Sequence, residues 1–400
     1  MSNNFTIPTQ ELPEEVIYLD YAATTPLDPN IKNRLINLLE SPNYFGNSSS
    51  SHYFGRQTQI LIDQADRSIR NALELGSNDK LIFTSGATES INLAIKGISS
   101  KGFSGKRGIV TTTLEHPAAQ NVCKSLEKQG FQVRYLKPDS KGMINPNLLT
   151  DSLLSDVFLV SLNWVDNEIG TIQNIREIGE ICQKKEIILH LDGVQAIGKI
   201  DLQLDKINFD LLSLSGHKIY GPKGIGLLIK KKRDLDFILN PQIEGGNQER
   251  GRAGTQPTEL IVALAMAIEC AVQNQKSETE RMKQLQDQLW SGLAPVSGII
   301  LNTDLENSIG NILNLSFQHV HHNALIDFLP GIAASQGSAC TSGSAEPSGH
   351  LLSLGLPRDL ALSNLRFSFG RWTTAEEIKK AIKIIKTGYE RLRAISPFGK

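Results

Sequence analysis

Short apolar runs alternate with amphipathic stretches from about residue 60 to residue 275. The runs are rich in Ile, Leu and Val, which is typical of buried strands; they are 81–83, 108–111, 157–160, 187–191, 210–212 and 226–229. Stretches such as 175–184 repeat apolar residues at helical spacing. This alternation predicts an α/β domain with a mostly parallel central sheet, in which ligands bind beyond the carboxyl ends of the strands.

The last part of the chain follows a different pattern. One long helix is expected from Glu259 to Leu293, followed by strands near 312–317 and 365–369. A last helix is predicted after Thr374, because Thr374-x-x-Glu377 is a capping-box pattern and apolar residues then recur at helical spacing. We therefore expect residues 28–275 to form a large α/β domain, and residues 1–27 and 276–400 to form a smaller α+β domain.

Composition and charge argue against several classes of protein. The 400 residues are 40% apolar and 21% charged, with a formal net charge of −1, which is typical of a globular protein and disfavours direct binding of nucleic acid or an anionic membrane surface. We expect no transmembrane helix, and the polar, acidic start of the chain does not resemble a signal or transit peptide. The 4 cysteines are scattered without a CxxC pair, which predicts a reducing, cytoplasmic compartment.

The segment 212–226 carries the strongest chemical signal. An apolar run leads to Ser215, His217 and Lys218, and a Gly/Pro turn then leads to the next apolar run. A lysine amine held among polar groups at a strand end can form a Schiff base with a carbonyl compound. On the segment alone, an ordinary exposed lysine in a turn between strands explains the pattern equally well.

Polar residues also follow other predicted strands. The turn at 84–90 precedes a helix, so its free backbone N–H groups and the hydroxyls of Ser85 and Thr88 could bind a phosphate, although an ordinary capped turn is the alternative. Asp192 ends a strand, where it could keep a pyridinium nitrogen protonated or simply cap a helix. Gln195 could cap as well, or hydrogen-bond the same ligand.

Three further residues are candidates because of their surroundings. His116 follows a predicted strand and could stack on a flat ring, move protons, or serve only as a turn residue. Arg366 lies in an apolar run and needs an anion, either a substrate carboxylate or a structural partner. Cys340 lies among small polar residues, which predicts an exposed loop and an accessible nucleophile, whereas the other cysteines lie in helical patterns and are expected to pack. The histidines of 319–322 lack acidic or cysteine neighbours, so no metal site is predicted there.

Taken in this order, the motifs resemble those of the cysteine desulfurases of the NifS/IscS group, which are pyridoxal phosphate (PLP) enzymes of fold type I in aminotransferase class V. The resemblance covers the chain from Tyr18 almost to its C-terminus. Its segments are 18–26 (YLDYAATTP), 45–52 (FGNSSSSH), 84–90 (TSGATES), 167–170 (NEIG), the Lys218 segment, 248–255 (QERGRAGT) and the Cys340 loop with Glu346-Pro347.

This resemblance implies a role for each candidate. Lys218 is implied to be the Schiff-base lysine and proton carrier, and Cys340 the nucleophile that takes the substrate sulfur. The other implied cofactor contacts are His116 stacking on the ring, Asp192 at the ring nitrogen, Gln195 at the ring oxygen, Asn167 beside the cofactor, and Ala87, Thr88, Ser215 and His217 at the phosphate. Thr255 is implied to reach the phosphate of the neighbouring subunit in a homodimer, and Asn167 and Arg366 to hold the substrate carboxylate.

The implied activity converts L-cysteine to L-alanine and leaves a persulfide on Cys340, which supplies acceptor proteins for iron–sulfur clusters or tRNA thiolation. A PLP-dependent cystine or cysteine lyase, a selenocysteine lyase and a non-catalytic protein of the same fold are alternatives. The chain departs from the usual family residues at three places: 192–195 reads DGVQ instead of DAAQ, 164–167 reads WVDN instead of HVNN, and 252–255 reads RAGT instead of RSGT.

Overall fold

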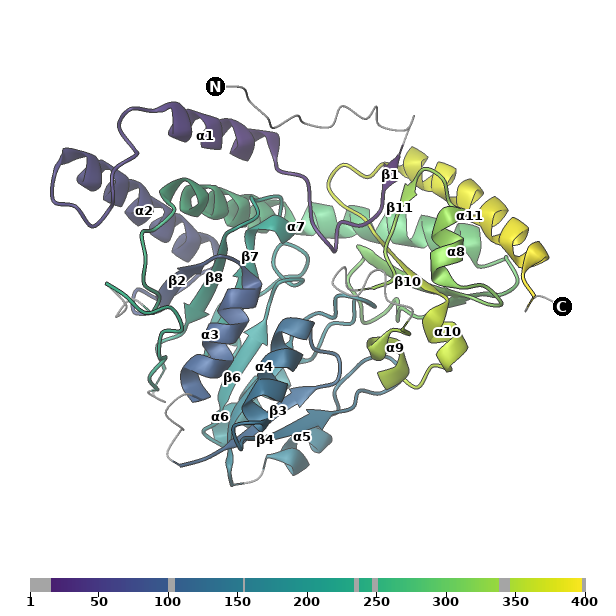
Figure 1. The fold of residues 1–400 in the computed structure, drawn as a ribbon, viewed down its shortest axis with the longest axis horizontal. Coiled ribbons are helices and arrows are strands. Elements are labelled where there is room, and N and C mark those ends of the chain that lie inside the picture. Colours follow the sequence, from purple (N-terminus) through teal and green to yellow (C-terminus); the bar gives the residue numbers. More distant parts are fainter. Residues whose placement is uncertain are drawn as a thin grey trace.

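The computed structural model describes residues 16–99, 105–153, 155–233, 237–246, 251–337 and 346–397. Its centre is a seven-stranded sheet with the order β2-β8-β7-β6-β5-β3-β4 (Figure 1). The strands are β2 (Lys80–Thr84), β3 (Gly108–Thr112), β4 (Gln132–Leu136), β5 (Val157–Asn163), β6 (Ile188–Asp192), β7 (Leu211–Ser215) and β8 (Gly226–Lys230). Only β8 runs against its neighbours. The predicted α/β class with a mostly parallel sheet is therefore confirmed.

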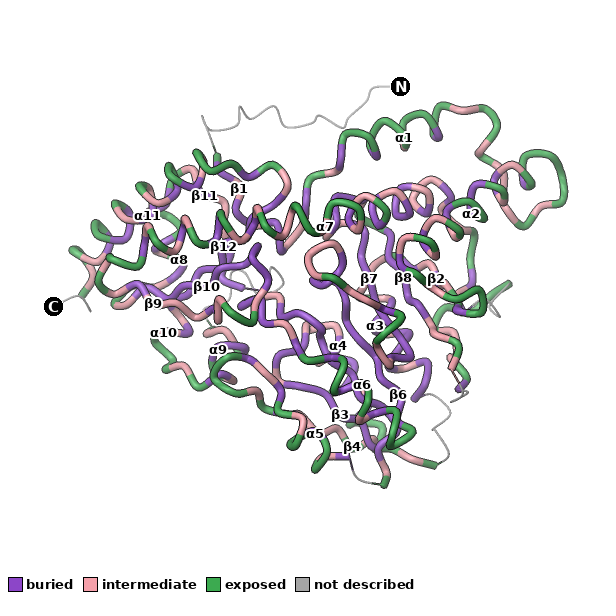
Figure 2. Tube along the Cα trace, turned by 180° about the vertical axis from the view of Figure 1, so that it is seen from behind, coloured by how far each residue is buried: buried purple, intermediate pink, exposed green. Residues whose placement is uncertain are grey.

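Residues of the sheet enter two apolar cores on opposite faces. Val157 and Val160 of β5 join one core with α2 (Tyr53–Ala72), α5 (Pro146–Ser152) and α6 (Ile175–Lys184), whereas Phe158 and Leu159 join the other with α3 (Ala87–Ser99) and α4 (Pro117–Glu127). Helices that cover both faces of a sheet leave its inner strands without a solvated face, and β3, β5, β6 and β7 are accordingly buried along their whole length. Figure 2 shows the strand traces as buried, with the exposed residues on the outer helices.

A second unit is built on antiparallel pairing. Its three-stranded sheet has the order β12-β10-β9, and a short parallel pair joins β1 to β11. These strands are β1 (Ile17–Tyr18), β9 (Ile299–Leu301), β10 (Ile312–Phe317), β11 (Ile332–Ala333) and β12 (Asn364–Ser368). Helices α8 (His322–Asp327), α9 (Gly349–Ser353), α10 (Arg358–Leu362) and α11 (Ala375–Ile395) follow in this later part of the chain, whereas α1 (Pro29–Glu40) packs in the first core. The predicted capping box of Thr374 and Glu377 opens α11.

Helix α7 (Thr258–Leu293) belongs to both units and crosses the molecule between them (Figure 1). Its first half, from Ile261 to Ala271, packs in the core with α2 and α6, and its second half, from Met282 to Leu293, packs in the core with β10 and α11. This change of core near the middle of α7 is consistent with the predicted boundary at 275/276, and that boundary and the one at 27/28 stay predictions. In the described part of the chain, no helix combines the length and apolarity needed to cross a membrane.

Candidate active site

The carboxyl ends of the strands meet at one cavity of about 420 Å³. Because β2, β3, β5, β6 and β7 run in the same direction, the residues that follow them lie along one edge of the sheet. Predicted site residues that line this cavity are Ala87, Thr88, His116, Asn167, Asp192, Gln195, Ser215, His217, Lys218 and Arg366. The structure thus brings these side chains together, while their individual roles stay predictions.

Lys218 follows β7 in a single 3-10 turn (Gly216–Lys218). Its Nζ donates hydrogen bonds to the backbone oxygens of Ala22 (2.6 Å) and Ala23 (2.8 Å), and the side chain is half-buried. The alternative of an ordinary exposed lysine is therefore wrong. An amine held at a fixed point in a cavity has lost most of its rotational freedom, which favours reaction with a bound carbonyl group.

Asp192 is the last residue of β6 and is only 8% exposed. Burial raises the pKa of its carboxyl to about 6, although the charge of Lys218 opposes that rise. Its Oδ1 accepts a hydrogen bond from the backbone N–H of Val194 (3.0 Å) in a turn, so it does not cap a helix. A buried carboxylate that accepts a single backbone hydrogen bond among the described residues would be stabilised by a protonated ring nitrogen.

Gln195 is oriented from two sides. Its Nε2 donates to the backbone oxygen of Ala22 (3.0 Å), and its Oε1 accepts a hydrogen bond from Nζ of Lys199. The lysine contact fixes which end of the amide is the acceptor, because an ammonium group can only donate. The Nε2 donor consequently faces the side of the cavity where Ala22 and Lys218 lie.

The turn after β2 leads directly into α3, whose first residue is Ala87. The backbone N–H groups of the first helical turn have no partner within a helix, and the helix dipole makes this end positive. The side chain of Glu89 accepts from the N–H of Ser85 (2.7 Å) and pairs with Arg252 (3.0 Å), which holds the turn in place. A Cβ at Gly226 would lie 2.6 Å from the backbone of Gly86, so only glycine allows β8 to approach this turn so closely.

His116 and His217 both face the cavity as neutral imidazoles. Burial, reinforced by the charge of Lys218, lowers the pKa of each ring to about 4. Nδ1 of His116 accepts from the N–H of Ala118 (3.1 Å) at the start of α4, and Nδ1 of His217 lies 3.1 Å from Oγ1 of Thr24. A neutral imidazole can stack on a flat ring without adding charge.

Arg366 has the structural partner that was one of its two predicted alternatives, and its role at a substrate carboxylate stays a prediction. The side chain is 1% exposed, and its Nη2 pairs with Asp20 (2.9 Å), which is the structural ion pair. Its Nη1 donates to the backbone oxygen of Asn167 (2.6 Å), and the residue also lines the cavity. Its Nε is buried and has no partner among the described residues. The guanidinium is therefore held in place with hydrogen-bonding capacity left over.

Two predicted site residues are not in the cavity. Thr255 is exposed, but its neighbours Gly254 and Gln256 line a second cavity of about 390 Å³ that shares Ser85 and Gly224 with the first. Cys340 lies outside the described residues. Of the other cysteines, Cys123 and Cys182 are buried thiols, as predicted for packing residues, and Cys270 is half-buried.

The histidines near residue 320 have local structural contacts. Nδ1 of His321 accepts from the N–H of Asn323 (3.3 Å) at the start of α8, and Nδ1 of His322 lies 2.8 Å from the backbone oxygen of Leu362. No cluster of three metal-ligating side chains occurs among the described residues.

Three polar residues near the cavity were missed by sequence reasoning. Burial, with the charges of Lys218 and Arg366, lowers the pKa of Lys199 to about 7. Burial raises the pKa of Glu115 to about 8. The pKa of His350 is raised by its neighbouring carboxylates, although burial alone would lower it. Glu115 directly precedes the predicted site residue His116, and this is the only sequence signal that points to it. Lys199 and His350 carry none, because their burial depends on distant segments.

Comparisons with known proteins agree with this geometry. The aminotransferase class-V family matches residues 17–381. The chain is 44% identical over 385 residues to cysteine desulfurase IscS of Serratia proteamaculans, covering 95% of this chain and 94% of that protein. Among solved structures, a NifS-like protein has a TM-score of 0.87 and 34% identity over 94% of this chain and 100% of its own. SspA in complex with cysteine has a TM-score of 0.78 and 34% identity over 89% and 99%.

A family match over most of the chain and this level of identity leave no ambiguity about ancestry. The strand-end cavity, with its half-buried lysine and buried aspartate, lies within the matched residues. The chain therefore belongs to the aminotransferase class-V family and, within it, to the cysteine desulfurases of the NifS/IscS group.

Proposed function

We propose that this protein is a PLP-dependent cysteine desulfurase that converts L-cysteine to L-alanine and transfers the sulfur to Cys340. The observation that carries the proposal is the cavity in which the Lys218 amine, the buried Asp192 carboxylate and the start of α3 meet. The similarity to a protein solved with cysteine supports cysteine as the substrate.

The residues of the cavity fit PLP. The dipole and first-turn N–H groups of α3, with the hydroxyls of Thr88 and Ser215, suit a phosphate. Asp192 suits a protonated ring nitrogen, because its buried carboxylate has no charged partner in direct contact among the described residues. When bound, PLP supplies an aldehyde that reacts with amines and a ring that withdraws electrons from the substrate carbon next to the amine.

Lys218 would bind the cofactor aldehyde until substrate takes its place. Its released amine would then remove the proton from Cα of cysteine and return a proton to the carbon skeleton. Ala22 and Ala23 support this role, since their oxygens hold the Nζ in one position between these steps. Asp192 would keep its negative charge beside the ring, and His116 would cover the ring with a neutral imidazole.

Asn167 and Arg366 would hold the substrate carboxylate at the other side of the cavity. The Cys340 thiolate would attack the substrate sulfur; the Cβ–Sγ bond breaks, the sulfur becomes the outer atom of a persulfide, and protonation of the remaining carbon gives alanine. Asp20 supports the role of Arg366 by fixing its guanidinium without occupying all of its donors.

Assembly, partners and location are further parts of the proposal. Thr255 would contact the phosphate in a neighbouring subunit of a homodimer, which its exposure next to the second cavity supports. Acceptor proteins for iron–sulfur clusters or tRNA thiolation would receive the persulfide sulfur. Placement in the cytoplasm rests on the scattered cysteines.

Product analysis tests the proposal. Purified protein loaded with PLP is incubated with L-cysteine and a thiol reductant, alongside Cys340→Ala. We expect equal amounts of alanine and sulfide, lost in Cys340→Ala, while Cys270→Ala keeps full activity. Pyruvate and ammonia, unchanged in Cys340→Ala, would instead identify a lyase on the same fold.

A further inference from the structure

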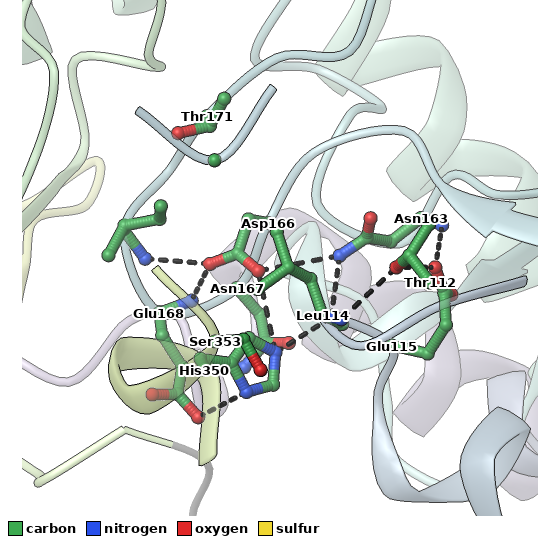
Figure 3. A network of polar contacts seen from close by, with 12 residues as sticks. Thr112, Leu114, Glu115, Asn163, Asp166, Asn167, Glu168, Thr171, His350 and Ser353 are labelled. Carbon is green, nitrogen blue, oxygen red and sulfur yellow. Dashed lines mark hydrogen bonds and ion pairs between the residues drawn. The ribbon is translucent and has the colours of Figure 1, made fainter. Parts of the chain in front are cut away.

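His350 lies at the centre of a buried charged cluster beside the active site (Figure 3). It belongs to α9, is 6% exposed, and points both ring nitrogens at acceptors. Nδ1 lies 3.1 Å from Oε1 of Glu168, and Nε2 lies 2.7 Å from the backbone oxygen of Leu114 and 3.4 Å from Oδ2 of Asp166. Both nitrogens must donate, so the geometry favours a protonated ring.

Glu168 extends the cluster to both ends of the Cys340 segment. Its Oε2 accepts a hydrogen bond from Oγ of Ser348 (2.6 Å), on the C-terminal side of Cys340. On the N-terminal side, a Cβ added to Gly337 would lie 2.6 Å from the same oxygen, so the backbone of Gly337 lies directly against the carboxylate. The side chain of Gln336 also donates to the backbone oxygen of Glu346 (3.3 Å), which joins the two ends.

The same cluster is continuous with the loops of the active site. His116 and Asn167 both line the cavity. His116 comes two residues after Leu114, and Asn167 lies between the two carboxylates of the cluster. A small apolar core of Leu114, Ile169, Leu351, Leu354 and Ala361 packs α9 and α10 onto these loops. The imidazolium therefore links the segment that follows Cys340 to the loops that bear His116 and Asn167.

The surrounding charges make this link depend on the proton of His350. Asp166 and Glu168 face the ring from the loop after β5, and Glu115 and His116 face it from the loop after β3. Without the imidazolium, two carboxylates would remain buried side by side, which is strongly unfavourable. Asp166 stands where the family usually has asparagine, so the acid and His350 form a charged pair that the usual residue could not make.

We propose that His350 is a positioning residue for sulfur transfer, which with Asp166 and Glu168 fixes both ends of the Cys340 segment against the His116 and Asn167 loops. The inference rests on the proposed function, because it concerns how Cys340 is presented to the substrate.

The first experiment separates presentation of Cys340 from binding of cysteine. The full-length protein loaded with PLP is compared with His350→Gln, whose amide keeps a donor toward Leu114 but carries no charge. We expect persulfide formation on Cys340 in the first turnover, followed by mass spectrometry, to slow at least tenfold. The cysteine concentration that gives half of the change in visible absorbance reports substrate binding, and it should stay within twofold of that of the unaltered protein. A slowing below twofold, or an equal loss in both measurements, contradicts the proposal.

A matched control and a rescue exclude a general loss of packing. His322→Asn alters another buried histidine, whose Nδ1 contacts a backbone oxygen and no carboxylate, and should leave the first turnover unchanged. Asp166→Asn combined with His350→Gln removes one of the two stranded carboxylates and should recover part of the lost rate. A double variant slower than His350→Gln would argue against the charged pair.

A readout that needs no turnover keeps the inference separate from the proposed function. Alkylation of Cys340 by iodoacetamide, located by mass spectrometry, should be at least fivefold faster in His350→Gln than in the unaltered protein at pH 6.5. The ratio should fall toward one at high pH, because the imidazole of the unaltered protein then loses its proton as well. If alkylation changes as expected but no alanine forms, the proposed function fails and the positioning role stands; a ratio within twofold of one at every pH overturns the positioning role.

Should His350→Gln not fold, Glu168→Gln, which keeps an acceptor for Ser348, carries the same test with the same expected directions.

Discussion

The two sides of the active-site cavity are built in different ways. The proposed cofactor side consists of residues at the ends of adjacent parallel strands, such as Asp192 at the end of β6 and Lys218 after β7. The proposed sulfur side consists of segments from both units, joined by charged contacts such as that of Arg366 in β12 with Asp20 and that of His350 in α9 with Glu168. Adjacent strand ends place the residues of the first side, whereas ion pairs between distant segments hold the second side together.

This difference predicts how each side responds to change. A substitution at a strand end removes a reacting group but leaves the register of the sheet intact, so activity should fall more than stability. A substitution in a buried charged cluster strands a charge and should affect stability and pH dependence together.

Loss of the Lys218 amine should have the largest effect. We expect Lys218→Ala to lower the rate of alanine formation by at least about 10³-fold, since it removes both the covalent attachment and the proton carrier. The melting temperature without PLP should change little. Borohydride reduction followed by mass spectrometry should attach PLP covalently to the unaltered protein and not to Lys218→Ala; Lys206→Ala, on the exposed side of the 3-10 turn Leu204–Lys206, is the control.

Neutralising Asp192 should have the next largest effect. Asp192→Asn keeps the size and the acceptor for Val194 but removes the negative charge, so we expect kcat to fall about 10²-fold at saturating PLP. Exposed Asp205→Asn controls for a change of net charge. A variant that kept more than a third of the activity would mean that the carboxylate has no part in the reaction.

Glu115 should make the stability of the protein fall as pH rises. Burial raises the pKa of Glu115 in the folded protein to about 8, so the folded state favours the protonated carboxyl. The resulting contribution to the unfolding free energy is complete below the ordinary pKa of glutamate and is lost as pH rises through about 8. The unfolding free energy of the unaltered protein minus that of Glu115→Gln should fall by about 3 kcal/mol between pH 5.5 and 7.5, at about 1.4 kcal/mol per unit. Denaturant titration measures this difference; a rise with pH would contradict the burial argument. Exposed Glu127→Gln controls for the loss of one carboxyl.

Gly193 offers a smaller and purely steric test on the cofactor side. A Cβ there would lie 2.5 Å from Cδ1 of Leu212, so Gly193→Ala should lower the unfolding free energy by about 1–3 kcal/mol, although alanine is the usual family residue. Adding Leu212→Val removes that methyl group and should restore part of the loss in a denaturant titration. If the double variant lost more unfolding free energy than the two single variants lose together, a contact other than the one with Leu212 would explain why glycine is present at position 193.

Sequence reasoning succeeded where local pattern and strand register determine position. Asp192, Lys218 and the start of α3 all follow apolar runs, and parallel pairing brings such ends together without further information. It did not name the edge strand β4, which includes exposed Gln132 and half-buried Arg134, or the short pair of β1 with β11, which distant segments create. It also could not find the partners of Arg366 and Glu168, because these lie far away in the chain. Roles implied by the family resemblance remain predictions for Cys340 and Thr255.

Helix α7 has a mechanical consequence. At about 1.5 Å per residue, its 36 residues form a rod of about 54 Å that is embedded at one end in each core. Such a rod resists bending, so the unit that carries Arg366 is held at a set angle to the sheet that carries Lys218. A proline near Gln275 would break the helix and allow the two units to move relative to each other. The two units should then unfold at separate melting temperatures.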